Sequence, residues 1–109
     1  MALIRALSGG VSGKKVFDDT LTGTSVDMQV ETVDVGFAPS SLIFSRDDGY
    51  CIIYDVNYSS SSVRYFKGTS ENGVVYSLPS STQFIRDISG SVITYINRAP
   101  YVIHVVAVE

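Results

Sequence analysis

The sequence is poor in the residues that carry most protein chemistry. It has one cysteine and one histidine among 109 residues, and no tryptophan. A single cysteine, Cys51, cannot form a disulfide within the chain, and we interpret it as a small buried apolar residue. A single histidine with no second histidine or cysteine at ligand spacing gives no zinc signature. We therefore expect neither a disulfide framework nor a metal site.

Basic residues and long apolar runs are also scarce. Eight lysines and arginines stand against 11 acidic residues, a net charge of −3, and Lys14-Lys15 is the only adjacent basic pair. Nucleic-acid binding needs clustered positive charge, so we expect no nucleic-acid partner. No apolar run reaches the ~18 residues of a membrane span, and the apolar start of the chain is too short for a signal-peptide core. We expect neither membrane insertion nor export.

The recognisable catalytic motifs are missing as well. The chain has no Gly-x-Ser-x-Gly elbow and no Walker pattern, and no pair of acids stands out as a glycosidase pair. The doublets Asp18-Asp19 and Asp47-Asp48 lack the further ligands of a calcium loop, so we interpret both as turns. His104 shares a face with valines and is interpreted as a hydrogen-bonded core residue. We expect no enzymatic activity and no cofactor.

The residues present in quantity are those of β-structure. Valine, threonine and seven tyrosines suit strands, helix formers are few, and serines cluster as in loops. Turn signals such as the Asp-Gly at Asp48-Gly49 and the Ser-Gly-Ser at residues 89–91 separate short apolar runs. This pattern predicts an all-β fold: a single antiparallel β-sandwich, jelly-roll-like, or a barrel of about eight short strands.

The chain divides into a leader and one domain. Residues 1–15 predict an N-terminal strand followed by a Gly-rich arm, and residues 16–109 predict the β-sandwich domain. The leader is either an arm that reaches a neighbouring subunit or an ordinary edge strand. At the other end of the chain, residues 101–108 are apolar throughout, which predicts a strand buried on both faces or pressed against a partner.

The strand expected at residues 25–31 alternates, with Met28 and Val30 pointing inward. Its phase slips at Thr32, which predicts a bulge or a corner near Glu31-Thr32, because a slip of one residue exchanges the two faces. After it, Gly36, Phe37 and Pro39 predict a structural corner. Glycine admits unusual backbone angles, phenylalanine can plug the end of a core, and proline belongs at a strand end.

Binding has better candidates than catalysis. We interpret Asn57, Tyr58, Ser59 and Ser60, within a polar loop at residues 57–62, as a surface-binding loop. Tyrosine gives rigid aromatic contacts, and serine and asparagine give adaptable hydrogen bonds, a combination typical of binding loops. A second exposed loop is expected at residues 68–73. The other six tyrosines are interpreted as residues that cover sheet faces.

The stretch VDVGFAPSSLIF resembles a motif of small proteins and domains from tailed bacteriophages and prophages. In that motif an alternating strand ends in Gly-Phe-x-Pro, and an apolar strand follows after two residues. The resemblance covers residues 26–109, including an apolar last strand that begins with a tyrosine, although a Tyr-x-Tyr pair is absent there. The residues that carry the match are Val33, Val35, Gly36, Phe37, Pro39, Leu42, Ile43 and Phe44.

The resemblance implies a non-enzymatic virion structural protein made in the host bacterial cytoplasm. It implies a tail- or fibre-associated module that acts in host-surface attachment. Its partners would be other virion proteins and a host-surface glycan, in a homo-oligomer such as the trimer common at fibre tips. The alternative is a capsid decoration protein, a cement or head-fibre protein that stabilises the phage head, which the compact size and the apolar leader would fit.

Overall fold

The computed structural model describes residues 14–22, 28–97 and 101–109, and these form strands and connections with no helix. Accordingly, no helix in these residues could span a membrane. The expected N-terminal strand and most of the arm lie outside the described residues. The strands are β1 (Val16–Thr22), β2 (Val30–Asp34), β3 (Ser41–Arg46), β4 (Cys51–Asp55), β5 (Ser59–Lys67), β6 (Glu71–Ser77), β7 (Ile85–Ser89), β8 (Val92–Ile96) and β9 (Val102–Val108).

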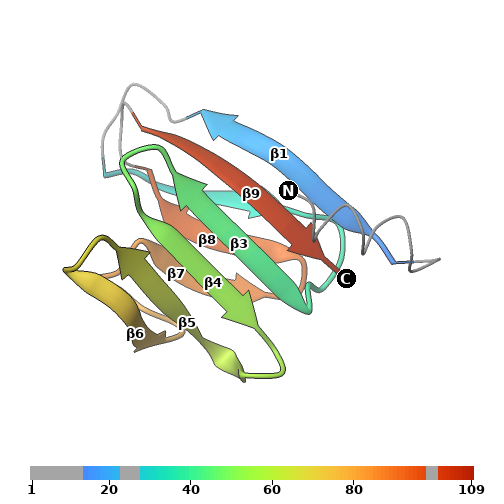
Figure 1. The fold of residues 1–109 in the computed structure, drawn as a ribbon. Helices are drawn as coiled ribbons and strands as arrows, with labels where there is room; N and C mark the ends of the chain where they lie inside the picture. Colours follow the sequence, from blue (N-terminus) through green and yellow to red (C-terminus); the bar gives the residue numbers. More distant parts are fainter. Residues whose placement is uncertain (1–13, 23–27, 98–100) are drawn as a thin grey trace.

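The strands form two antiparallel sheets, which confirms the predicted β-sandwich. One sheet has the order β1-β9-β3-β4-β5-β6, and the other has the order β2-β8-β7. In Figure 1 the larger sheet lies in front and the smaller one behind it. The inward residues of β3 alternate with half-buried outward ones, as expected for a sheet that covers a core on one face.

The core between the sheets is rich in aromatic side chains. Phe44 meets Phe84 and Tyr95 edge to face, with ring centroids 6.1 and 5.7 Å apart. The hydroxyl of Tyr65 accepts a hydrogen bond of 2.7 Å from the backbone N–H of Ile85. That bond joins β5 of the large sheet to β7 of the small one, so a buried polar group links the two layers instead of remaining unsatisfied.

Strand β9 is buried on its inner face, and on its outer face it is buried at Val106 and Val108 but exposed at His104, so its apolar sequence predicts most of its burial. It lies between β1 and β3 in the middle of one half of the large sheet. Ile103 and Val105 point into the core, whereas Val106 and Val108 are buried on the opposite face. Figure 1 shows β9 crossing the front layer with the C-terminus at its end.

The interpretation of Asp18-Asp19 as a turn is wrong, because both residues lie within β1. The register pairs Phe17 with Ala107 and Leu21 with Ile103, so these two apolar side chains face the core. The two acids between them stay exposed at the edge of the sheet. Charged residues on an edge strand oppose pairing with another chain.

The prediction for residues 25–31 is also wrong in part. Met28 lies in a turn with φ +65°, and both Met28 and Val30 are exposed rather than inward-facing. Strand β2 then pairs with β8 from Val30 to Asp34 without a shift, so the bulge or corner expected near Glu31-Thr32 is absent. The phase slip in the sequence arises because the turn at Met28 comes before β2, so the residues on its two sides belong to different elements. Residues 25–27 lie outside the described residues.

Gly36, Phe37 and Pro39 lie in the connection between β2 and β3, which carries the chain from the small sheet to the large one. Gly36 has φ +87°, a backbone angle that favours glycine, and its N–H donates to the Asp34 carboxylate at 2.9 Å. Phe37 and Pro39 are buried. The connection therefore closes one end of the core.

Candidate functional site

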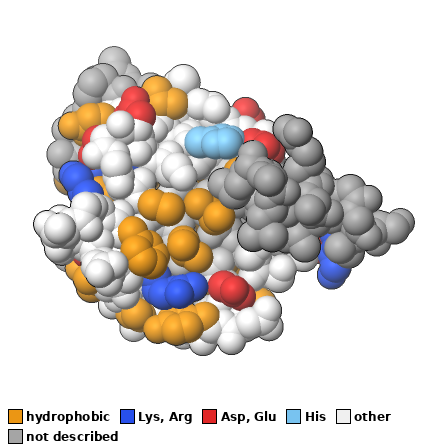
Figure 2. Space-filling view, viewed as in Figure 1, with side chains coloured by type: hydrophobic (Ala, Val, Ile, Leu, Met, Phe, Trp, Pro, Cys, Tyr) orange, Lys and Arg blue, Asp and Glu red, His pale blue; other side chains and the backbone are white. Residues whose placement is uncertain are grey.

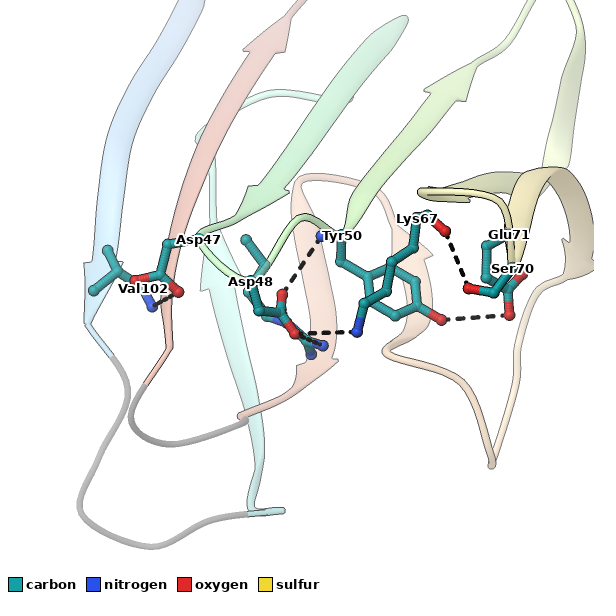
Figure 3. Close-up of polar contacts among 8 residues, drawn as sticks. Asp47, Asp48, Tyr50, Lys67, Ser70, Glu71 and Val102 are labelled. Carbon is teal, nitrogen blue, oxygen red and sulfur yellow. Dashed lines mark hydrogen bonds and ion pairs between the residues drawn. The ribbon is translucent and has the colours of Figure 1, made fainter.

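A polar cluster lies at the other end of the sandwich, where two hairpins meet. The β3–β4 turn contains Asp47, Asp48 and Gly49, and the N–H of Gly49 donates to the Arg46 carbonyl at 3.0 Å. This confirms the hairpin that the Asp-Gly sequence predicts. The β5–β6 turn begins after Lys67, and Figure 3 shows the Lys67 side chain directed toward Asp48 across Tyr50. The two hairpins thus present cations, acids and an aromatic ring to one another.

Arg46 is the centre of this cluster. Its side chain sits at an inward position of β3, where its Nε and Nη2 donate to the two Asp48 carboxylate oxygens, each at 2.7 Å. The guanidinium also lies 4.9 Å from the ring centroid of Tyr50, 4.8 Å from that of Phe84 and 5.2 Å from that of Tyr101. A planar, weakly hydrated cation suits such a partly aromatic environment.

The acid beside Arg46 is held ionised. The hydrogen bonds from Arg46 lower the pKa of Asp48 from 3.8 to about 2, against the opposing effect of burial. Lys67 adds a second cation, with its Nζ 3.6 Å from Asp48 Oδ2. Asp48 therefore contacts two cations, one from each hairpin, and holds the two hairpins together.

Tyr50 completes the cluster between the hairpins. Lys67 Nζ lies 5.1 Å from its ring centroid, and the Tyr50 hydroxyl lies 3.5 Å from Glu71 Oε1. Burial, followed by the negative charge of Glu71, raises the pKa of Tyr50. The hydroxyl therefore stays protonated and can donate to Glu71 (Figure 3).

A pocket of about 170 Å³ opens beside this cluster, between the two sheets. Arg46, Tyr50 and Phe84 form its aromatic and cationic wall. Arg86 enters from β7, and its Nε is buried without a hydrogen-bond partner among the residues that the structure describes. The remaining lining residues are Met28, Thr82, Gln83 and Ile96. This combination of guanidinium and aromatic groups has the chemistry to hold a small polar group.

The predicted surface-binding loop is shorter than expected. Asn57 and Tyr58 lie in the β4–β5 turn, but Ser59 and Ser60 already belong to β5. The Asp55 carboxylate accepts the N–H of Asn57 at 2.9 Å, and the Asp55 carbonyl accepts the N–H of Tyr58 at 3.0 Å. The turn is thus held by its own first residue, a typical Asx arrangement.

Tyr58 is the most prominent side chain of that turn. It is 56% exposed, and the Arg64 guanidinium lies 4.5 Å from its ring centroid. Arg64 stands on the outer face of β5, so the pair projects from the sheet rather than entering the core. The turn therefore presents an aromatic ring and a cation together.

The two loops expected to bind lie too far apart to form one surface. Residues 56–58 precede β5 and residues 68–70 follow it, so the loops are at opposite ends of a nine-residue strand. At about 3.3 Å per residue, the separation is on the order of 25–30 Å. A single ligand the size of a short glycan would contact one loop or the other.

The two reactive side chains that the sequence offers lie on the outer face of the large sheet. His104 is exposed, with Nε2 2.6 Å from Asp18 Oδ1, so its interpretation as a core residue is wrong. Cys51 is only half-buried, and burial raises the pKa of its thiol. Among residues 14–22, 28–97 and 101–109, no group of three or more metal-ligating side chains comes together.

Sequence reasoning missed the Arg46 cluster, although one signal for it was present. Arg46 follows Leu42 and Phe44 at every second position, so the alternation of β3 places a charge where an inward residue is due. An inward arginine requires a carboxylate partner, and Asp48 stands two residues away in a turn. The aromatic partners Phe84 and Tyr101 come from distant segments and give no such signal.

Comparisons with known proteins found no match. No family model matches the sequence, and neither the curated proteins nor the solved structures include one significantly similar to it.

Proposed function

We propose that this chain is a non-enzymatic structural protein of a bacteriophage virion. It belongs to the tail or a tail fibre and takes part in attachment to the host surface, as part of a homo-oligomer bound to other virion proteins. The sequence resemblance supports this proposal, and its Gly36, Phe37 and Pro39 lie in the connection between the two sheets.

The observation that carries the attachment role is the arrangement of Tyr58. More than half of this side chain is accessible, yet its turn is fixed by Asp55 and its ring is held beside Arg64. A preorganised aromatic side chain loses little conformational entropy on binding. Its ring can stack on a sugar, while serine hydroxyls and the arginine supply hydrogen bonds. A host-surface glycan is the ligand class that fits this surface.

The test is adsorption of phage particles that carry Tyr58→Ala. We expect weaker adsorption to host cells and an unchanged melting temperature of the isolated protein, because Tyr58 lies outside the core. Tyr58→Phe keeps the ring and is expected to retain most adsorption. Thr69→Ala, in the exposed turn at the opposite end of β5, is the matched control. Normal adsorption of the Tyr58→Ala phage would remove this turn from the proposal.

The second candidate is a capsid decoration protein, and the outer face of the large sheet favours it. Figure 2 views this face and shows hydrophobic side chains gathered near its centre. Ile43 and Ile53 lie opposite each other on this face, and Val75 farther along the sheet is 46% exposed. Such a face suits attachment to another protein. Binding of the isolated chain to glycans is expected for the attachment protein and not for a decoration protein.

A further inference from the structure

The pocket beside the Arg46 cluster has a second guanidinium in its wall. Arg46 comes from β3 and Arg86 from β7, and the described lining residues include no aspartate or glutamate. Asp48 accepts two N–H groups of Arg46 and offsets its charge. Arg86 Nε is buried and has no hydrogen-bond partner within the part of the chain that the structure describes. Because a buried donor without an acceptor is costly, an anion bound here would stabilise the folded chain.

Arg86 reaches the pocket because β7 is irregular at this residue. The register between β7 and β8 shifts between Ile85 and Asp87, which leaves Arg86 as the extra residue of a β-bulge. Ile85 is fully buried in the core, so regular alternation would turn the next side chain to the outside. A bulge redirects a side chain, and here Arg86 lines the pocket instead. The irregular strand therefore supplies the charge that faces Arg46 across the pocket.

The segment that precedes β7 forms a fixed rim of the pocket. Ser80 Oγ accepts the backbone N–H groups of Thr82 and Gln83 at 3.2 and 3.1 Å. The N–H of Ser80 donates to the Arg86 carbonyl at 2.7 Å, and the Phe84 carbonyl accepts a backbone N–H of β8 at 2.8 Å. Thr82 and Gln83 add neutral polar groups to the lining. A rim that is held in place before binding loses little conformational entropy when a ligand enters.

The size of the pocket and its apolar side limit what it can hold. Its volume is about 170 Å³, and a cavity of about 150 Å³ is enough for one benzene ring. Phe84 and Ile96 are buried and give the pocket an apolar side, to which Met28 contributes. The matching ligand is a single ring that carries a carboxylate. Its anionic group would meet the guanidiniums, which bind carboxylates with paired hydrogen bonds, and its carbon–hydrogen face would meet the apolar side.

We propose that this pocket binds the carboxylate of an acidic sugar, such as a uronic acid unit, between the guanidiniums of Arg46 and Arg86. The carboxylate follows from the residues of the pocket, whereas the choice of a sugar ring rests on the proposed function, in which a host-surface glycan is the ligand. Tyr50 lines the pocket and contacts Lys67, the last residue of β5, whereas Tyr58 lies just before that strand. The pocket is therefore a site separate from the turn around Tyr58.

The experiment is an NMR titration of the full ¹⁵N-labelled chain with methyl β-D-glucuronide at constant ionic strength. Methyl β-D-glucoside, which has a hydroxymethyl group in place of the carboxylate, is the matched control ligand. We expect saturable shifts of the amides of Gln83, Phe84 and Arg86 with the glucuronide. The glucoside should bind at least about tenfold more weakly, because hydrogen bonds to a charged group are the stronger kind.

Two results of this titration would overturn the proposal. One is equal affinity of the pocket for the two ligands, or no shift at the pocket with either of them. The other is a set of glucuronide shifts confined to the turn around Tyr58, which would leave the attachment role standing. Conversely, Tyr58→Ala should leave the shifts at the pocket unchanged, so a failure of the adsorption test does not decide the outcome here.

A variant of Arg86 tests the residue that carries the proposal. Arg86→Gln removes the charge and should weaken glucuronide binding at least about tenfold. Its melting temperature should be unchanged or higher, because the substitution removes a buried donor that has no partner among the described residues. Arg64→Gln, on the outer face of β5, is the matched control and should keep the wild-type affinity of the pocket. Equal binding of the glucuronide by wild type and Arg86→Gln would overturn the proposal.

Discussion

Asp48→Asn tests the Arg46 cluster at its strongest contact. The substitution removes the negative charge that receives two 2.7 Å hydrogen bonds from Arg46 and faces Lys67. Breaking a buried ion pair costs about 3–5 kcal/mol; we expect about 2–4 kcal/mol here, because asparagine keeps one acceptor and solvent is near. The measurement is the free energy of unfolding from urea titration at neutral pH.

The same pair predicts how stability depends on pH. The folded-state pKa of Asp48 is lowered from 3.8 to about 2. Its contribution is therefore fully present above pH 3.8 and is lost as the pH falls through about 2. We expect a loss on the order of 1–2 kcal/mol over this range, reduced from the full linkage value by solvent screening. Asp48→Asn cannot lose this contribution, so its stability curve should approach that of the wild type at low pH.

The matched control is Asp19→Asn, which removes an exposed acid of β1 whose carboxylate accepts only the neighbouring N–H of Thr20 among the contacts described. We expect a change of less than about 0.5 kcal/mol. Equal destabilisation by the two substitutions, or a constant gap between wild type and Asp48→Asn from pH 7 to pH 2.5, would refute the assignment of Asp48 as the structural partner of Arg46.

Two further substitutions test the core and the corner. Tyr65→Phe leaves the buried N–H of Ile85 without its acceptor, so urea unfolding should show a loss of about 1–3 kcal/mol; a loss below 0.5 kcal/mol would mean that this link between the sheets adds little. In Gly36→Ala the added Cβ would have no atom within 4 Å, but residue 36 has φ +87°, which strains any residue with a side chain. Thermal unfolding should therefore show about 1–2 kcal/mol of destabilisation from backbone strain alone. A stabilised Gly36→Ala variant would contradict that angle.

The fold could be predicted because its local signals agree. The Ser-Gly-Ser at residues 89–91 was expected to turn the chain between two apolar runs, and it joins β7 to β8. The burial of most of β9 follows from a run that is apolar except for His104. At both places the composition, the periodicity and the turn residues favour the same structure.

The errors have a common physical cause. Strand β1 forms because it pairs with β9, which lies far along the chain. In the sequence, the adjacent acids Asp18 and Asp19 interrupt the apolar pattern of its inward residues Phe17 and Leu21. The phase of β2 is fixed by pairing with β8 and not by the alternation expected over residues 25–31. The site was harder to predict because Arg46 is surrounded by rings from three separate segments. Contacts that depend on long-range pairing leave little trace in local sequence.

The most direct test of the proposed function is immunogold electron microscopy with an antibody to this chain on particles of the phage that encodes it. We predict gold at the tail or its fibres, where the turn around Tyr58 can reach the host. Gold over the head would favour the decoration protein and the outer face of the large sheet. Particles without gold would contradict a virion role altogether.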